Sequence, residues 1–289
     1  MILRIAFIFV TFVFSSASMA DSWGPITQRE FRSENGKHLL KIEPRKGSDK
    51  PGHCHATLFR IAGKERTELW SRFLINNHAP VRVFVSNTGD FVLTMDEWHS
   101  VGELPVVIYG QRGGLVRVHS TDSLGLKDDD KHIAQTVSSY WWNAGSMSFF
   151  GPKDETFFIH LHWGKLLLID LDDGDLMDDE WYSVAKEWQM SETKWNSLHG
   201  YANAEIEKRA LRWLESEEAD ERKIGAVLCG RRNLKDAIPG LKKLLTDQAH
   251  FMAIGTDHST RLYYVRRAAK QALEKLGEDA GDVVLTARE

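Results

Sequence analysis

One stretch decides the fold class of the first half of the chain: Val81-Arg82-Val83-Phe84-Val85-Ser86-Asn87-Thr88-Gly89-Asp90-Phe91-Val92-Leu93-Thr94. Its first five residues place a valine at every second position, which puts the valines on one face of a strand. The glycine four residues later takes a positive φ at low steric cost and so permits a tight turn. A second apolar run follows the turn. The pattern predicts an antiparallel β-hairpin.

The same pattern of strand, turn and strand recurs on both sides of this hairpin. Further strand pairs are predicted at 56–61 with 67–73, 106–109 with 115–118, and 157–163 with 166–169. Short strands with regular glycine turns are typical of antiparallel β domains. The sequence therefore predicts a β domain over residues 21–178, with a polar segment at 123–135 that forms a short helix or a loop.

The periodicity changes near residue 180, where apolar residues begin to recur at helical spacing. Helices are predicted at 204–216, 220–232, 234–245 and 260–276, with Gly277 as the C-cap of the last. Trp181, Trp188 and Trp195 are seven residues apart, which places them on one stripe of a helix. We expect them to pack the junction between two domains; an exposed aromatic binding surface is the alternative. The fold class is thus α+β with two domains: 21–178 antiparallel β, 179–202 a helical junction, and 203–289 helical.

The helical half contains an internal repeat. Arg222-Lys223-Ile224-Gly225-Ala226-Val227-Leu228-Cys229-Gly230 matches Arg266-Arg267-Ala268-Ala269-Lys270-Gln271-Ala272-Leu273-Glu274. Other parts of the pattern are Val265-Arg266-Arg267-Ala268-Ala269, Leu276-Gly277, Ala237-Ile238-Pro239 and Leu244-Leu245-Thr246-Asp247. These residues resemble HEAT-like repeats of the phycobilisome-lyase type. The resemblance covers about residues 204–285, and it implies a short array of stacked helices; chromophore-lyase chemistry ranks last among the activities considered. An insertion at 248–259 separates the two copies, and the second copy lacks the Ile-Pro pair.

The hairpins of the first half are similar to single blades of a β-propeller. The similarity is carried by 85–94, by 107–116 and by Leu168-Ile169-Asp170-Leu171-Asp172-Asp173-Gly174. About 150 residues allow three blades at most, so the resemblance implies an open, partial propeller-like arrangement that packs on the helices. The two resemblances together imply a secreted HEAT-repeat protein of unassigned activity.

Residues 1–20 are typical of a secretory signal peptide. Arg4 is followed by an uncharged apolar segment at 5–14 and by the small-x-small sequence Ser18-Met19-Ala20. We therefore predict an exported protein, periplasmic or extracellular, with no stable membrane span after cleavage; an uncleaved anchor is the alternative. Cys54 and Cys229 lie in apolar stretches and are interpreted as small buried hydrophobic residues, although an oxidising compartment would also allow them to pair.

Two His-x-His pairs are the candidate metal ligands: His53 with His55, and His160 with His162. Residues two apart in a strand share a face, so each pair can present two imidazoles to one ion. If the two strands were neighbours, the four histidines could hold zinc or copper. The alternating apolar residues predict that both pairs point to solvent, and exposed histidines without a metal are the default interpretation.

Composition and motifs exclude several other function classes. Apolar residues make up 42% and charged residues 27% of the 289, and the net charge is −4, which disfavours binding to nucleic acid. The sequence contains no P-loop, dinucleotide-binding glycine loop or nucleophile elbow, so no catalytic residue is predicted. The acidic segment 170–175 departs from the calcium-binding EF-hand spacing and is interpreted as a hairpin turn.

The sequence therefore predicts an exported, non-enzymatic interaction or scaffold protein with a protein partner and no cofactor. Stacked helical repeats provide an extended binding surface, and no set of reactive groups is predicted to converge. The alternative function is a metal-binding protein or metal-dependent enzyme that uses the His-x-His pairs with zinc or copper.

Overall fold

The computed structural model describes residues 23–44, 53–177, 192–254 and 259–288. The predicted signal peptide, Trp181 and Trp188 lie outside these residues. None of the described helices is both long enough and apolar enough to cross a membrane.

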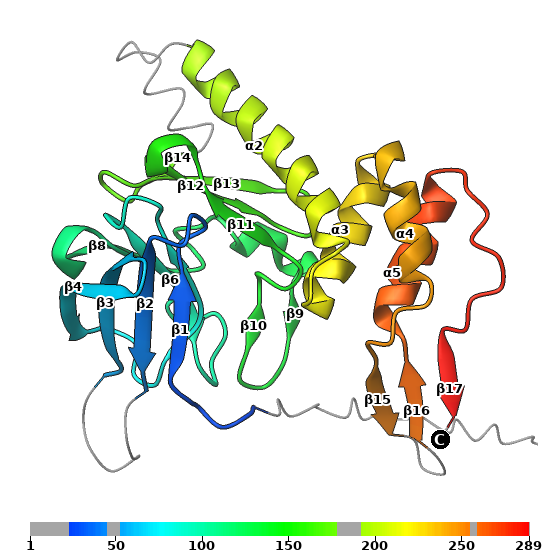
Figure 1. Cartoon of the computed structure of the whole chain (residues 1–289), viewed down its shortest axis with the longest axis horizontal. Coiled ribbons are helices and arrows are strands. Elements are labelled where there is room, and N and C mark those ends of the chain that lie inside the picture. The colour runs from blue at the N-terminus through cyan, green and yellow to red at the C-terminus, as the bar shows by residue number, and fades with distance from the viewer. Residues whose placement is uncertain (1–22, 45–52, 178–191, 255–258, 289) are drawn as a thin grey trace, which may run out of the picture.

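The first half of the chain forms three antiparallel four-stranded sheets (Figure 1). In each sheet, strands that are consecutive in the chain are neighbours. The first sheet contains β1 (Arg29–Arg32), β2 (His38–Glu43), β3 (His55–Ala62) and β4 (Glu65–Phe73). The second contains β5 (Pro80–Val85), β6 (Val92–Glu97), β7 (Val106–Tyr109) and β8 (Leu115–His119). The third contains β11 (Met147–Phe150), β12 (Thr156–His160), β13 (Leu166–Asp170) and β14 (Leu176–Met177). The antiparallel β organisation predicted from the hairpins is confirmed.

Short elements connect these sheets. Strands β9 (Ala134–Gln135) and β10 (Tyr140–Trp141) pair with each other. The 3₁₀ helices are η1 (Gln111–Gly113), η2 (Lys127–His132), η3 (Pro152–Asp154) and η4 (Lys235–Ala237). The helix η2 confirms the short helix expected within 123–135.

The hairpin at 81–94 has the predicted register, since Val85 pairs with Val92 across the turn. Gly89 in this turn has a φ of +79°, and a Cβ placed on it would lie 2.6 Å from the imidazole of His38. Both observations explain why glycine occupies the position: the left-handed conformation and the close approach of the first sheet exclude a side chain.

The second half is helical, with α2 (Glu192–Trp213), α3 (Ala219–Arg231), α4 (Ile238–Leu244) and α5 (Tyr264–Lys275). Helix α2 runs without a break through the division expected at residues 202 and 203. The helix predicted at 260–276 begins four residues too early, because Ser259–Leu262 is strand β16. It pairs with β15 (Phe251–Ile254) and with β17 (Thr286–Arg288). This pairing with the end of the chain is a long-range contact, which local periodicity does not reveal.

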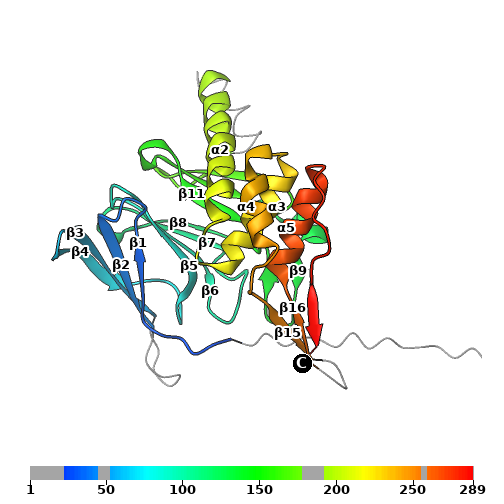
Figure 2. The ribbon, with the colours of Figure 1, turned by 45° about the vertical axis from the view of Figure 1, so that its right-hand side comes forward.

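The third sheet is buried on both faces and joins the two halves (Figure 2). Phe157 and Ile159 of β12 pack into a core shared with the second sheet. Phe158, which points the other way, packs into a core shared with the helices. A third core lies between the first and second sheets. Because β12 is covered on both sides, residues on either face of this strand are shielded from solvent.

The two repeat copies lie on α3 and α5, and several matched positions are buried in both copies. Gly225 and Ala269 are buried, as are Leu228 and Ala272. Asp247, after α4, binds the arginine that begins each copy. It accepts a hydrogen bond on its carboxylate from Arg222 Nε at 2.6 Å and one on its backbone carbonyl from Arg266 Nε at 2.5 Å.

Close packing of α3 on α5 depends on Gly230. A Cβ at this position would lie 2.8 Å from the backbone Cα of Ala272. We expect Gly230→Val to lower the free energy of unfolding by about 2 kcal/mol, because the helices must separate to admit the side chain. Urea unfolding measures this. Gly200→Ala is the control, since a Cβ at that position would have no neighbouring atom within 4 Å, and helix propensity should make it stabilising by about 0.5–1 kcal/mol. Equal stability of Gly230→Val and the parent protein would contradict the packing argument.

Candidate functional site

A line of connected cavities follows α3 where this helix faces the β half. Cavities of about 490, 570, 300 and 390 Å³ succeed one another, and each shares lining residues with the next. We call this line the α3 groove; on α3 and its C-cap it is lined by Asp220, Glu221, Lys223, Ile224, Val227, Leu228, Arg231 and Arg232.

The cavity of about 570 Å³ brings together three histidines and two arginines. We call it the histidine–arginine cavity; it is lined by His132, His160, His162, Trp163, Gly164, Leu228, Arg231 and Arg232. Four different segments supply these side chains: the end of η2, the strand β12, the turn after β12, and the C-terminal end of α3. The alternation of β12 explains the placement of His160, because Ile159 and Leu161 take the face toward the second sheet.

Three buried nitrogen atoms of this cavity have no hydrogen-bond partner among the described residues. They are Nδ1 of His160, Nδ1 of His162 and Nε1 of Trp163. The ring of Trp163 stacks on that of His132, with centroids 5.5 Å apart and an interplanar angle of 13°. Buried polar groups are normally paired, so this concentration of unpaired groups marks the cavity as unusual.

The cavity is electrostatically positive. Burial, with Arg232 and Arg231 nearby, lowers the pKa of His160 to about 4. Burial and Arg231 also lower the pKa of His162. Arg232 donates to Asn203 Oδ1 at 3.0 Å and lies 3.5 Å from Glu207 Oε1, so its charge is partly balanced. His160 is therefore neutral at pH 7 and lies beside two guanidinium groups.

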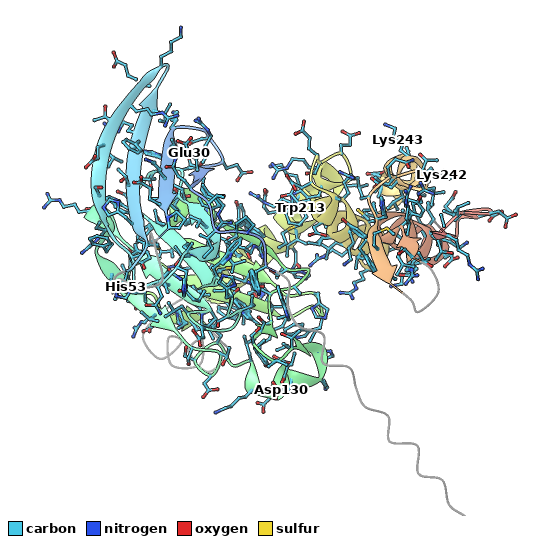
Figure 3. All side chains as sticks on the ribbon, turned by 90° about the horizontal axis from the view of Figure 1, so that it is seen from below. Glu30, His53, Asp130, Trp213, Lys242 and Lys243 are labelled. Atoms are coloured by element: carbon cyan, nitrogen blue, oxygen red, sulfur yellow. The ribbon has the colours of Figure 1, made fainter. Side chains whose placement is uncertain are left out.

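The four predicted metal ligands do not come together. His53 and His55 belong to the first sheet, where β3 pairs with β2 and β4, whereas His160 and His162 belong to the third sheet. Figure 3 shows His53 on the β half, away from the helices. Within the part of the chain that the structure describes, no group of three or more His, Cys, Asp or Glu residues is arranged to hold a metal ion.

The prediction that His160 faces solvent is wrong. His160 is only 6% exposed, because the helices cover the face of β12 opposite the second sheet. His53 is exposed, as predicted, and His55 is half-buried beside Phe73 and Glu43.

Of the three tryptophans predicted to pack the domain junction, Trp195 lies within the described residues, and its packing agrees with the prediction. Trp195 packs against the core between the third sheet and the helices, and Trp213 lies at the boundary between the two halves (Figure 3). Trp142 is fully buried, and Trp141 stacks on Trp23 with an interplanar angle of 13°.

Both cysteines are buried and unpaired, which confirms their interpretation as small hydrophobic residues. Burial raises the pKa of each thiol to about 12, so neither is a reactive thiolate at neutral pH. The acidic segment 170–175 forms the predicted turn between β13 and β14. The backbone N–H of Asp172 donates to Asp170, that of Asp175 donates to Asp173, and Arg117 pairs with Asp175.

A buried carboxylate that the sequence analysis did not single out organises the second sheet. Asp96 is 0% exposed and has a φ of 60°. Its carboxylate accepts hydrogen bonds from Trp142 Nε1 at 2.8 Å, Asn143 Nδ2 at 2.6 Å and Gly102 N at 2.9 Å. All three donors lie on loops that follow β6, so the role of Asp96 is structural. The sequence signal for a buried role of Asp96 was its position within the apolar run of β6.

The lysine pair Lys242-Lys243 forms surface ion pairs. Lys242 lies 2.8 Å from Glu278, and Lys243 lies 3.8 Å from Glu215. Figure 3 shows both lysines at the outer end of the helical half, away from the α3 groove.

Comparisons with known proteins identify no relative by sequence: no family model matches the chain, and no curated protein matches it. Among solved structures, a Bacteroides fragilis chain described as a candidate 6-phosphogluconolactonase is similar at 13% identity and a TM-score of 0.30. The match covers 53% of this chain and 37% of that chain, so this protein spans well under half of its length. Residues 644–1017 of HIRA are similar at 12% identity and a TM-score of 0.29, over 88% of this chain and 94% of that chain. Such low TM-scores carry no argument about activity or partners.

Proposed function

We propose that this is an exported, non-enzymatic scaffold protein that binds a segment of a partner protein in the α3 groove. Its main support is one observation: the central cavity of the groove, of about 300 Å³, combines an apolar floor with a cationic rim. Ile224, Val227 and Leu228 line it from α3, while Lys223 and Arg231 flank them. Apolar surface supplies affinity and unbalanced charge supplies specificity, which is the combination expected of a binding site.

The dimensions of α3 suit an extended peptide segment. The helix has 13 residues, which corresponds to a length of about 20 Å at 1.5 Å per residue. An extended chain rises about 3.3 Å per residue, so about six residues would follow the groove. At the central cavity, charge complementarity favours a partner segment that combines apolar and acidic residues, whereas Asp220 and Glu221 line the neighbouring cavity of about 390 Å³. Arg231 forms no ion pair with the residues that the structure describes, and Lys223 lies over the ring of Tyr264 at 5.7 Å.

The finer architectural interpretations belong to this proposal. A HEAT-like array is supported by the matched positions that are buried in both copies, on α3 and on α5, and by the two arginines that bind Asp247. A partial propeller-like arrangement is supported by the three consecutive four-stranded sheets. Export is supported by the charge and apolar pattern of residues 1–20.

A peptide library displayed on phage and selected against the purified protein tests the groove. We expect the selected peptides to be enriched in acidic residues beside apolar ones. Val227→Glu should weaken binding of a selected peptide about tenfold or more, because it places a carboxylate on the apolar floor and repels the acidic peptide.

Lys64→Glu is the matched control, since it introduces the same new carboxylate at an exposed turn of the first sheet. Binding to this variant should stay within about twofold of the parent protein. Circular dichroism establishes that both variants are folded. Selection of peptides without acidic enrichment, or equal loss of binding in both variants, would contradict the proposal.

A further inference from the structure

We infer that the histidine–arginine cavity binds an oxyanion of the phosphate class, carried by a phosphate monoester. This inference goes beyond the proposed function and stands without it, because the ligand is a small molecule and the site is the part of the groove formed by β12, η2 and Arg231-Arg232.

The unpaired nitrogen atoms of the cavity supply the first argument. His160, His162 and Trp163 each have a buried nitrogen without a partner among the described residues, and all three line the same cavity. An imidazole with its proton on Nδ1 donates from that atom, and an indole nitrogen only donates. Buried donors without partners are costly, and a ligand with several acceptor oxygens would remove that cost. A phosphate group has several acceptor oxygens that point in different directions, so one group can accept from several of these donors.

The charges of the cavity supply the second argument. Arg231 and Arg232 bring two positive charges, and Glu207 balances only part of the second from 3.5 Å. The C-terminal end of α3 adds about half a negative charge, which is smaller than either guanidinium. Lys165 of the neighbouring cavity pairs with Asp129 at 2.8 Å, so this ion pair adds no net charge. The cavity therefore keeps an excess of positive charge, which agrees with the lowered pKa of His160.

The cavity has room for an organic group together with the phosphate. A water molecule occupies about 30 Å³ of liquid, and the cavity of about 570 Å³ has room for far more than one phosphate group. Leu228 and the stacked rings of Trp163 and His132 form its less polar wall. The remaining space therefore suits an organic group attached to the phosphate, with guanidinium groups binding the oxygens bidentately.

Isothermal titration of the full protein with glycerol phosphate, and separately with inorganic phosphate, tests the inference at constant ionic strength and with a chelator present. We expect saturable binding of glycerol phosphate that is at least as tight as that of inorganic phosphate. Arg231→Gln should weaken it about tenfold, and a double variant with Arg232→Gln should abolish it. His162→Gln should weaken it less, because it removes only one neutral donor.

Arg267→Gln is the matched control. It removes the same charge from an exposed position on α5 and should change the affinity by less than about twofold. Three results would overturn the inference: no saturable binding of either phosphate, unchanged binding by the double variant, or binding that requires added zinc. The peptide test of the α3 groove relies on Val227 and a different ligand, so failure of one test leaves the other intact.

Discussion

Replacing Asp96 with alanine is expected to lower the free energy of unfolding by about 4 kcal/mol. The substitution leaves three buried donors, on Trp142, Asn143 and Gly102, without their shared acceptor. Each unsatisfied buried group costs about 1–3 kcal/mol, and relaxation recovers part of that cost. Alanine would also have to adopt the φ of 60° found at this position, which asparagine and aspartate tolerate better. Urea unfolding above pH 7 measures the effect.

Asp96→Asn is the matched control for this experiment. Asparagine keeps the shape and one acceptor oxygen, so we expect a smaller loss of about 1–2 kcal/mol.

Burial raises the pKa of Asp96 from 3.8 to about 6, so the folded state holds this proton more tightly than the unfolded state. The raised pKa therefore adds to the free energy of unfolding below pH 3.8, where the carboxyl is neutral in both states. This contribution is lost as the pH rises through about 6. A loss below about 1 kcal/mol in the alanine variant would show that the three donors find other partners.

The second large effect is a loss of stability in acid that arises from His160. Its pKa is about 4 in the folded protein and 6.5 in the unfolded chain. As the pH falls through this window, the unfolded state binds the proton first, so the free energy of unfolding decreases. The difference corresponds to about 3 kcal/mol between the two values. The charged, titratable and aromatic groups that line the two cavities beside this imidazole are Arg231 and Arg232 at the end of α3, His132 from η2, His162 and Trp163 from the following turn, Lys165 before β13, and Trp195 and His199 from α2.

His160→Gln tests this prediction, because glutamine is polar and does not titrate. Between pH 6.5 and 4, the free energy of unfolding should fall less in the variant than in the parent protein, and the two falls should differ by up to about 3 kcal/mol. Urea unfolding in a buffer without phosphate measures both. His53→Gln, at an exposed position, should follow the parent profile. Parallel profiles of the parent and His160→Gln would contradict burial of a neutral imidazole.

Particular residues show where sequence patterns were sufficient. The valines of 81–85 and the turn at Gly89 led to the observed hairpin, because alternation and glycine conformation are local properties. The periodicity of 220–232 led to α3 for the same reason. The helix expected from residue 260 began too early, because Thr260 pairs with Arg288 near the far end of the chain.

For the candidate site, the sequence pointed to His160 and His162 but paired them with the wrong partners. It combined them with His53 and His55 through their common spacing, whereas the fold places them beside Arg231 and Arg232. The spacing of residues within one strand shows which side chains share a face of the sheet. It does not show which element covers that face, and here α3 covers the face that carries His160.

The sequence by itself determined that the chain changes from β hairpins to helices near residue 180, and it identified which segments repeat. These properties follow from side-chain periodicity and from the backbone preferences of glycine, which act over a few residues. The tertiary structure alone decided that β12 is buried on both faces, that Asp96 joins three donors, and that histidines and arginines share one cavity. Those features depend on the packing of elements distant in the chain, which is governed by burial and complementarity across the whole fold.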